Sequence, residues 1–270
     1  MRGPSERPFK AFDFAQSASR RNLGRQPGRS GAISAIDAPF EKEKRRNRSV
    51  GAYPVPSYDM VIFDFDGTLA DSAAWMIKAV NPMALRFGFK TVTDEEIDML
   101  RGRGTREVIR YLGISPWKLP MIASHGKKLM AAECHSIPLF PETAAMLKAL
   151  HDAGLRLAVV SSNSERTIRS VLGPELSGLI SQFSCGASLF GKARKFRKVT
   201  SGASRDRVIC IGDETRDIEA AHALGLACGA VTWGAAKRAI LAEHGPTIVF
   251  ESPSEIISHL VASRAMIGGD

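Results

Sequence analysis

Apolar runs alternate with amphipathic stretches along most of the chain. Nearly continuous apolar runs lie at 58–63, 155–160 and 208–211, and weaker runs lie at 226–233 and 247–250. A continuous apolar run bounded by turn residues is typical of a strand in a parallel sheet that is buried on both faces. We therefore expect these segments to form a parallel sheet.

Between the apolar runs, apolar residues recur every three or four positions, which places them on one face of a helix. This spacing predicts helices at 142–152, 165–172, 193–200, 217–224 and 235–243. Alternating strands and helices indicate an α/β fold. The expected fold class is α/β, with a Rossmann-like, doubly wound parallel sheet.

The stretch 72–136 breaks this alternation, because it contains amphipathic helical patterns and no segment typical of a strand. Helices are expected at 73–87, 94–100 and 105–112, and in a further segment after Pro120. We interpret the stretch as a small α-helical domain inserted after the first strand. The core domain is then predicted to consist of residues 57–71 and 137–270.

Residues 1–56 are rich in Arg, Ser, Gly and Pro and lack a sustained hydrophobic period, so we expect a disordered tail. They hold 12 Lys and Arg against 5 Asp and Glu, whereas the rest of the chain holds 25 against 23. The net charge of +9 therefore belongs mainly to the tail. Because the remainder is nearly neutral, we do not expect nucleic acid to be the main partner.

The amino terminus lacks the apolar segment of a secretory signal, and no stretch is a convincing membrane span. We expect a soluble cytoplasmic protein that has no membrane partner. A monomer or a homodimer is expected.

Carboxylates follow the ends of two predicted strands. Asp64 and Asp66 come directly after the first strand, and Asp213 and Asp217 follow the run at 208–211. Ligands of parallel α/β sheets bind beyond the carboxyl ends of the strands, so we expect these side chains to converge. Such a cluster persists if a divalent cation neutralises it, and oxygen ligands without Cys or His indicate Mg²⁺.

Polar and basic residues complete this edge of the predicted sheet. Ser161 and Ser162 follow the strand at 155–160, and Lys192 and Lys195 lie at the start of a predicted helix. A lysine ammonium at that place would meet a phosphate as a point charge.

Together, these residues resemble the four motifs of the haloacid dehalogenase superfamily. Residues 64–68, DFDGT, match the first motif, DxDGT, and Ser161 after its apolar strand matches the second. A lysine upstream of the last motif strand matches the third, and residues 212–217, GDETRD, match the fourth, GDxxxD. The motifs occur in order over residues 58–250.

The resemblance implies a phosphatase that works through a phosphorylated aspartate. Asp64 would be the nucleophile, and Asp66 would protonate the leaving alcohol and then activate water. Mg²⁺ would be held by the carboxylates of Asp64 and Asp213 and by the backbone carbonyl of Asp66. Asp217 would orient the lysine or a metal-bound water.

The resemblance also implies a set of phosphate-binding groups. Ser161, Ser162, the motif lysine and the backbone amides near Asp66 and Gly67 would contact the phosphoryl oxygens. Two lysines match the third motif; we favour Lys192 because it lies at the helix start, where anions bind best, with Lys195 as the alternative. Asp66 favours phosphate esters, because the dehalogenase members lack this second aspartate.

The insert resembles the C1-type helical cap of this superfamily. Residues 100–107 loosely resemble the specificity loop of phosphoglycolate phosphatases and β-phosphoglucomutases. Arg101, Arg103 and Arg106 would there bind a carboxylate or a second phosphate. The alternative is three exposed arginines around a flexible glycine turn. A small phosphorylated metabolite, phosphoglycolate-like or a sugar phosphate, is the expected substrate.

Two other functions stay open. A phosphoglucomutase-like phosphotransferase would use the same Asp64 and Asp66. A non-catalytic regulatory or binding protein would use the basic tail, and salt-dependent DNA binding that disappears on deletion of residues 1–56 would indicate it. Residues competent for catalysis occupy all motif positions, which favours an enzyme.

Overall fold

The strands of the computed structural model form a parallel sheet in the order β3-β2-β1-β4-β5-β6. The model describes residues 57–186 and 191–265. The strands are β1 Met60–Phe63, β2 Arg156–Val160, β3 Ile180–Ser184, β4 Val208–Gly212, β5 Ala227–Val231 and β6 Ile248–Phe250. The central β1 pairs with β2 on one side and β4 on the other. The winding of the chain therefore reverses at β1, where α/β folds place their ligands.

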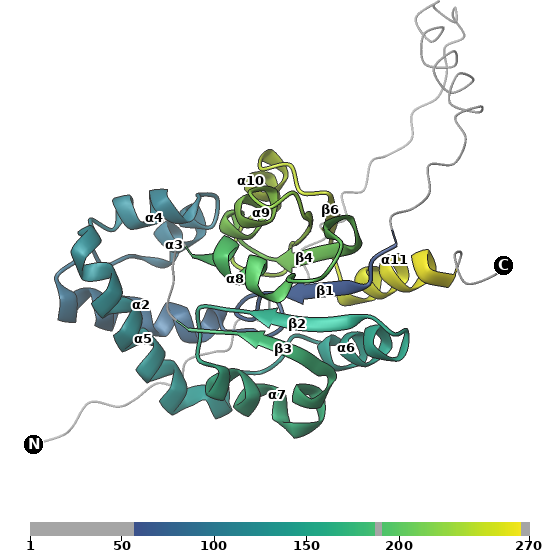
Figure 1. Ribbon diagram of the computed structural model, residues 1–270. Helices are drawn as coiled ribbons and strands as arrows, with labels where there is room; N and C mark the ends of the chain where they lie inside the picture. The colour runs from purple at the N-terminus through teal and green to yellow at the C-terminus, as the bar shows by residue number, and fades with distance from the viewer. Residues whose placement is uncertain (1–56, 187–190, 266–270) are drawn as a thin grey trace, which may run out of the picture. The chain divides into compact units, whose positions relative to one another are not determined.

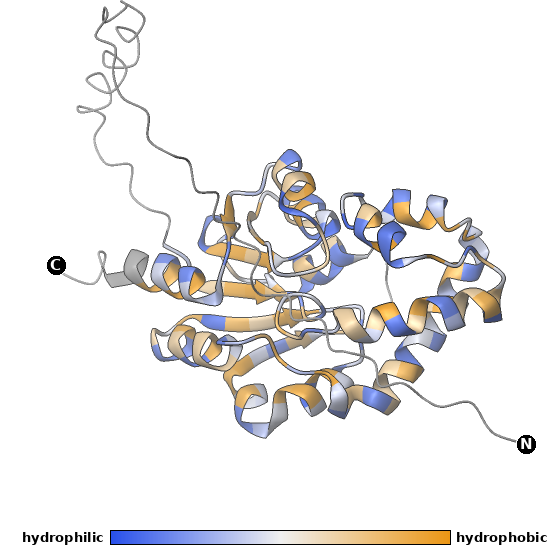
Figure 2. Ribbon diagram, turned by 180° about the vertical axis from the view of Figure 1, so that it is seen from behind, coloured by the Kyte–Doolittle hydropathy of each residue, from blue (hydrophilic) through white to orange (hydrophobic). Residues whose placement is uncertain are grey.

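Helices cover both faces of this sheet (Figure 1). The helices of the core are α6 Thr143–Asp152, α7 Glu165–Leu179, α8 Lys192–Val199, α9 Thr215–His222, α10 Arg238–Glu243 and α11 Pro253–Ala265. Successive strand residues point to opposite faces, so Val61 and Phe63 pack in one apolar cluster and Met60 and Ile62 in another. Figure 2 shows the apolar strands between helices whose outer faces are hydrophilic. The predicted α/β fold is confirmed.

The strand β3 and the helix α11 were not predicted from the sequence, and α7 is longer than predicted. The edge strand β3 follows directly on α7, and it is buried only at its two ends instead of forming a continuous buried apolar run. Helix α7 also extends beyond the predicted residue 172, across a kink at Gly173, where φ is 73°. The helix α11 contacts α6 and covers one face of the sheet near the end of the chain.

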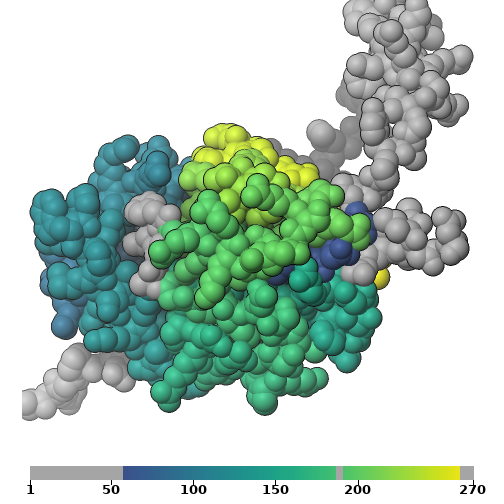
Figure 3. All heavy atoms as spheres, viewed as in Figure 1, coloured from purple at the N-terminus to yellow at the C-terminus, as the bar shows by residue number. Residues whose placement is uncertain are grey.

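The insert at 72–136 consists of helices and contributes no strand among the described residues. It contains α2 Ala73–Phe87, α3 Asp94–Leu100, α4 Thr105–Tyr111 and α5 Leu119–Glu133, with short 3₁₀ turns at Pro116–Lys118 and Cys134–Ser136. Val92, Leu100 and Leu112 form a small apolar cluster of their own. Helix α3 begins with a capping box between Thr93 and Glu96. Figure 3 shows the atoms of this segment gathered in one blue-green region.

The predicted tail at residues 1–56 lies outside the described residues. Within 57–186 and 191–265, none of the helices combines the length and the apolar character that crossing a membrane requires.

Candidate active site

A tight turn after β1 positions the first two carboxylates. The N–H of Asp64 donates to the carbonyl of Ile211 in β4, 2.8 Å away, which ties the end of β1 to its neighbour. The carbonyl of Phe65 then accepts from the N–H groups of Leu69 and Ala70, both at 2.9 Å. The chain therefore folds back within a few residues, and the side chain of Asp64 stays buried at the strand end.

Gly67 provides space for Asp213. Its φ is +78°, and a β-carbon at this position would lie 2.1 Å from Oδ2 of Asp213. The N–H of Gly67 donates to the carbonyl of Ala70 at 2.9 Å. The contact of the backbone amides near Asp66 and Gly67 with phosphate stays a prediction, whereas the space for Asp213 depends on the absence of a side chain at Gly67.

Asp213 follows β4 and is held through both of its oxygens. Oδ1 accepts from Oγ1 of Thr68 at 2.9 Å, and Oδ2 accepts from the N–H of Ala235 at 2.8 Å. Burial raises the pKa of this carboxyl well above its ordinary value, and the negative charges of Glu214 and Asp64 raise it further. An ionised Asp213 therefore requires a compensating positive charge.

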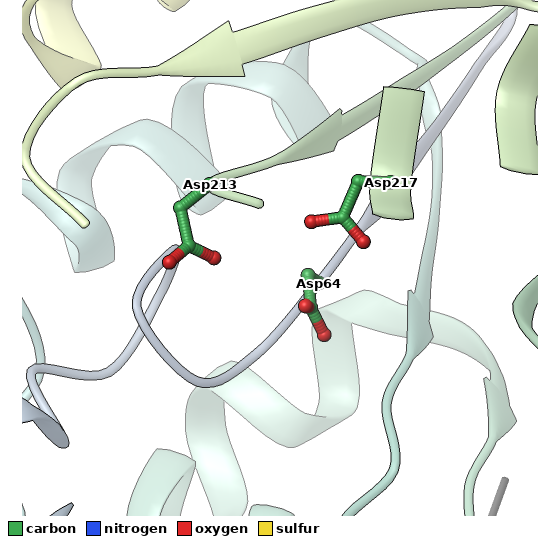
Figure 4. A group of neighbouring side chains, drawn as sticks. All are labelled: Asp64, Asp213 and Asp217. Carbon is green, nitrogen blue, oxygen red and sulfur yellow. The ribbon is translucent and has the colours of Figure 1, made fainter. Parts of the chain in front are cut away.

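Three carboxylates converge at this edge of the sheet (Figure 4). One oxygen from each of Asp64, Asp213 and Asp217 lies within 4.8 Å of the others, and the three residues are at most 4% exposed. Buried, all-oxygen ligands without His or Cys fit a hard cation such as Mg²⁺. This group of acids includes Asp217 and leaves out the side chain of Asp66, for which the sequence predicted a ligand through its backbone carbonyl.

Lys192 contacts two of these carboxylates. Its Nζ lies 2.6 Å from Oδ2 of Asp64 and also forms an ion pair with Oδ1 of Asp217. Burial disfavours the charged ammonium, but Asp217 and Asp64 more than offset this and raise the pKa of Lys192 above its ordinary value. The residue is therefore a permanent cation inside the cluster, placed by the first turn of α8.

Lys195 lies one helical turn further along α8 and contacts carbonyls instead. Its Nζ donates to the carbonyls of Ser161 and Gly186, at 2.5 and 2.6 Å. Desolvation lowers the pKa of this ammonium to about 8. The geometry thus distinguishes the two lysines that match the third motif, because Lys192 contacts Asp64 directly.

The end of β2 brings Ser161 and Ser162 to the same edge of the sheet. Ser161 is 1% exposed, and its Oγ accepts from the N–H of Asn163 at 3.0 Å. The hydroxyl hydrogen of Ser161 therefore remains available to donate to a bound anion. Ser162 is partly exposed at the next position.

Asp66 lies outside the group of three acids but close to it. Burial and the charge of Asp64 raise the pKa of Asp66 to about 6, while hydrogen bonds from Ser72 and Asn163 oppose the shift. A carboxyl with this pKa exchanges a proton near neutral pH, as a general acid and base must.

The three arginines of the insert have separate surroundings. Arg101 donates from Nε to the carbonyl of Ala235 at 3.0 Å and from Nη2 to the carbonyl of Gly234 at 3.2 Å. The Nε of Arg103 lies 3.2 Å from Sδ of Met99. Arg106 is exposed on α4. Arg101 therefore joins the insert to the loop after β5, and its guanidinium already has two acceptors.

Sequence reasoning missed Arg216 and Glu214. Arg216 donates from Nη2 to Oε1 of Glu214 at 2.7 Å, and Oε2 of Glu214 accepts from Oγ1 of Thr105 in the insert at 3.1 Å. Both residues occupy variable positions of the GDxxxD motif. Their place within that motif, one residue from an expected site residue, was the available signal.

Comparisons with known proteins confirm the family that the sequence resembles. A family model for haloacid dehalogenase-like hydrolases matches residues 61–231. A phosphoglycolate phosphatase of Synechococcus elongatus is 33% identical over 200 residues, which cover 73% of this chain and 94% of that protein. Phosphoglycolate phosphatase 1 of Pseudomonas aeruginosa is 24% identical and covers 73% of this chain and 78% of its own length.

A solved structure supports the same fold. The crystal structure of a predicted phosphatase from Clostridium acetobutylicum aligns with a TM-score of 0.66 at 21% identity. The alignment covers 76% of this chain and 99% of that one. At this identity the likeness concerns the fold alone.

Proposed function

Because the chain belongs to the haloacid dehalogenase-like hydrolases, we propose that it is a Mg²⁺-dependent phosphatase that forms a phosphorylated Asp64. Its sequence identity to phosphoglycolate phosphatases indicates that it is a phosphoric monoester hydrolase. The observation that carries the finer proposal is the contact of Lys192 with Asp64 inside the group of buried carboxylates.

Asp64 is the proposed nucleophile. One of its carboxylate oxygens attacks phosphorus, and the bond between phosphorus and the ester oxygen breaks as the new bond forms. Asp66 gives its proton to the departing alcohol oxygen. Water then attacks the phosphorus of the phosphorylated Asp64, the bond between phosphorus and the Asp64 oxygen breaks, and Asp66 takes the proton of that water. The products are the alcohol, inorganic phosphate and the original carboxylate, and one difficult displacement becomes two easier ones.

The pKa of Asp66, about 6, supports its proposed role as the proton carrier. A general acid that works near neutral pH must hold its proton in the first step and accept one in the second. Asp66 lies two residues after Asp64, beyond the end of β1. Both carboxyls are therefore positioned by the same turn.

The carboxylates of Asp64 and Asp213 and the backbone carbonyl of Asp66 would hold Mg²⁺. When bound, this ion neutralises negative charge on the phosphoryl oxygens. Lys192 supplies a positive charge to the same oxygens, and Ser161 donates its hydroxyl hydrogen to them. Ser162, partly exposed beside Ser161, is the further phosphate contact that we propose.

The proposed substrate is a small phosphomonoester such as phosphoglycolate. The two relatives named above carry the name phosphoglycolate phosphatase. Residues 72–136 act in this proposal as a cap over the substrate, because Arg101 and Thr105 join the insert to loops that hold Asp213. Arg103 and Arg106 lie on the exposed side of this segment as the remaining candidates for a second anionic group.

The test is phosphate release from phosphoglycolate, phosphosugars and p-nitrophenyl phosphate, with Mg²⁺ or EDTA, by wild type and Asp64→Asn. We expect Mg²⁺-dependent release that the substitution abolishes, and a hydroxylamine-sensitive phosphoryl group on the wild-type peptide containing Asp64, detected by mass spectrometry after acid quenching. A folded wild type that releases no phosphate from any ester contradicts the proposal. Isomerisation of a phosphosugar without release of phosphate identifies a phosphotransferase instead.

A further inference from the structure

Arg216 carries a buried hydrogen-bond donor that has no acceptor among residues 57–186 and 191–265. The residue lies in the first turn of α9, directly before Asp217, and its side chain is 19% exposed. Nη2 donates to Glu214, but the buried Nε has no hydrogen-bond partner. Such a donor costs folding free energy, because it has lost its water and gained nothing in exchange. An acceptor supplied by a ligand would remove this cost.

The guanidinium of Arg216 lies close enough to the proposed catalytic carboxylates for their charges to interact with its own. Burial disfavours its charge, but Glu214, Asp64 and further acids of the cluster raise the pKa of Arg216 above its ordinary value, and Arg216 in turn lowers the pKa of Asp66. A phosphoryl group attacked by Asp64 must lie against that carboxylate. It would therefore also lie within reach of the charge of Arg216.

The charge balance of the site also favours a second fixed cation of the protein beside the phosphoryl group of the substrate. The acids around the guanidinium are Asp64, Asp66, Asp213, Glu214 and Asp217, and the cations among them are Lys192 and Arg216. With a divalent ion added, the site still carries no excess of positive charge for a phosphate dianion. Each fixed cation beside the phosphoryl group therefore contributes to its binding.

We propose that Arg216 binds the phosphoryl group of the substrate through its unpartnered Nε–H, as a second cation beside Lys192. The inference rests on the proposed phosphatase function, which already requires a phosphoryl group at Asp64. It adds a substrate-binding residue that none of the four motifs specifies, because the position of Arg216 in GDxxxD is variable.

Glu214 is the positioning residue for this arginine. Its Oε1 accepts from Nη2 of Arg216 and its Oε2 accepts from Thr105 of the insert, so one carboxylate orients the guanidinium and contacts α4. The plane of a guanidinium is fixed when one of its nitrogens is held, which aims the remaining N–H groups. The insert is therefore connected to the orientation of Arg216 through a single side chain.

The decisive experiment measures the binding of inorganic phosphate, by calorimetry in saturating Mg²⁺, to wild type, Arg216→Met and Arg216→Lys. Arg207→Met is the matched control, because the side chain of Arg207 is 40% exposed and forms an ion pair with Asp59. We expect Arg216→Met to weaken phosphate binding by about tenfold to a hundredfold. Arg216→Lys should recover part of the loss, since it keeps the charge but not the Nε–H. Arg207→Met should bind as wild type does.

A second titration separates substrate binding from neutralisation of the carboxylates. If Arg216 binds phosphate, Arg216→Met loses phosphate affinity while its Mg²⁺ affinity is unchanged or tighter, because a competing cation has been removed. If phosphate affinity is unchanged in Arg216→Met and Arg216→Lys and their melting temperatures fall, the arginine serves stability alone and the proposal is overturned. Should Arg216→Met fail to fold, Arg216→Lys and Glu214→Gln carry the same measurement.

Failure of the phosphatase proposal would look different. In that case the wild type releases no phosphate from any ester, whatever the variants do. Because calorimetry with inorganic phosphate requires no turnover, the inference about Arg216 is tested in either case. Equal phosphate affinity in an active wild type and in both Arg216 variants overturns the inference alone.

Discussion

Lys192 places its Nζ 2.6 Å from Oδ2 of Asp64, and this contact joins the start of α8 to the end of β1. The two residues are far apart in the sequence and both are buried. The ammonium therefore stabilises a carboxylate that has little contact with water, and it lies where a phosphoryl group would bind to Asp64. This arrangement makes the roles of the lysines in α8 testable.

Lys192→Met should reduce kcat/KM for phosphoglycolate by about 100-fold to 1,000-fold, the usual effect of removing one charged donor from a transition state. Lys195→Met should cost less than about tenfold, because Lys195 contacts backbone carbonyls and not Asp64. Lys198→Met, exposed on the same helix, is the control. Steady-state kinetics of the three variants decides between the lysines. A larger loss in Lys195→Met than in Lys192→Met would reverse the assignment.

Gly67→Ala should disrupt the site, because the new β-carbon would lie 2.1 Å from Oδ2 of Asp213 and the backbone has a φ of +78°. We expect the free energy of unfolding to fall by about 2–5 kcal/mol from strain and overpacking combined. Gly113→Ala is the matched control: its φ is +65°, but nothing lies within 4 Å of the added carbon. It should cost only the backbone strain, about 1–2 kcal/mol.

Urea unfolding of both glycine variants checks this prediction. A Mg²⁺ titration should also show weakened metal binding in Gly67→Ala alone, because only there does the substitution displace Asp213. Equal destabilisation of the two variants would mean that the contact with Asp213 has no energetic consequence.

The stability of the metal-free protein should depend on the protonation of Asp66. The pKa of Asp66 is raised to about 6 in the folded protein, so the folded state binds this proton more tightly than the unfolded state. Its contribution to stability is therefore present below about pH 4 and is lost as the pH rises to about 6. Asp66→Asn removes this dependence, since the amide stays neutral.

Urea unfolding in EDTA at several pH values measures this effect. The wild type should lose stability relative to Asp66→Asn across the interval from about pH 4 to about pH 6 and should run parallel to it above that interval. Asp152→Asn, at the exposed end of α6, is the control and should follow the wild type throughout. Parallel curves for wild type and Asp66→Asn at every pH would refute the raised pKa.

Arg101→Gln tests whether this arginine holds the insert or recognises the substrate. Its guanidinium donates to the carbonyls of Gly234 and Ala235. If its role is to dock the insert, KM should rise by about tenfold for phosphoglycolate and equally for phenyl phosphate, which lacks a second anionic group. Arg110→Gln, exposed on α4, is the control. A rise confined to phosphoglycolate would instead assign Arg101 to the substrate carboxylate.

The sequence was informative where a local rule decides the structure. The runs that became β1, β2 and β4 are buried on both faces, so nearly every residue in them is apolar. The edge strand β3 has a mixed pattern, since only part of it is covered, and no comparable signal existed. In α7, Gly173 and Pro174 concealed the continuation of the helix, because glycine and proline normally interrupt a helical pattern.

For the candidate site, the motif spacing predicted which residues meet but not how they pair. Asp64, Asp213 and Asp217 were expected together and lie together. The preference for Lys192 rested on its place in the helix, and the contact with Asp64 was visible only in three dimensions. The hydrogen bond from the N–H of Gly67 to the carbonyl of Ala70 was likewise visible only in the structure.

By itself, the sequence determined the α/β alternation, the helical insert and the carboxylates at the strand ends, because these follow from periodicity and from chain order along parallel strands. Tertiary structure decided which charged groups meet at the candidate site. Arg216 and Glu214 are separated by one residue, yet their connection to Thr105 and to the carboxylate cluster depends on how α4 packs against α9. The hydrogen bonds and the pKa of a side chain in the site depend on the residues that packing brings close to it. Several of these residues, such as Lys192 for Asp64, lie far away in the sequence.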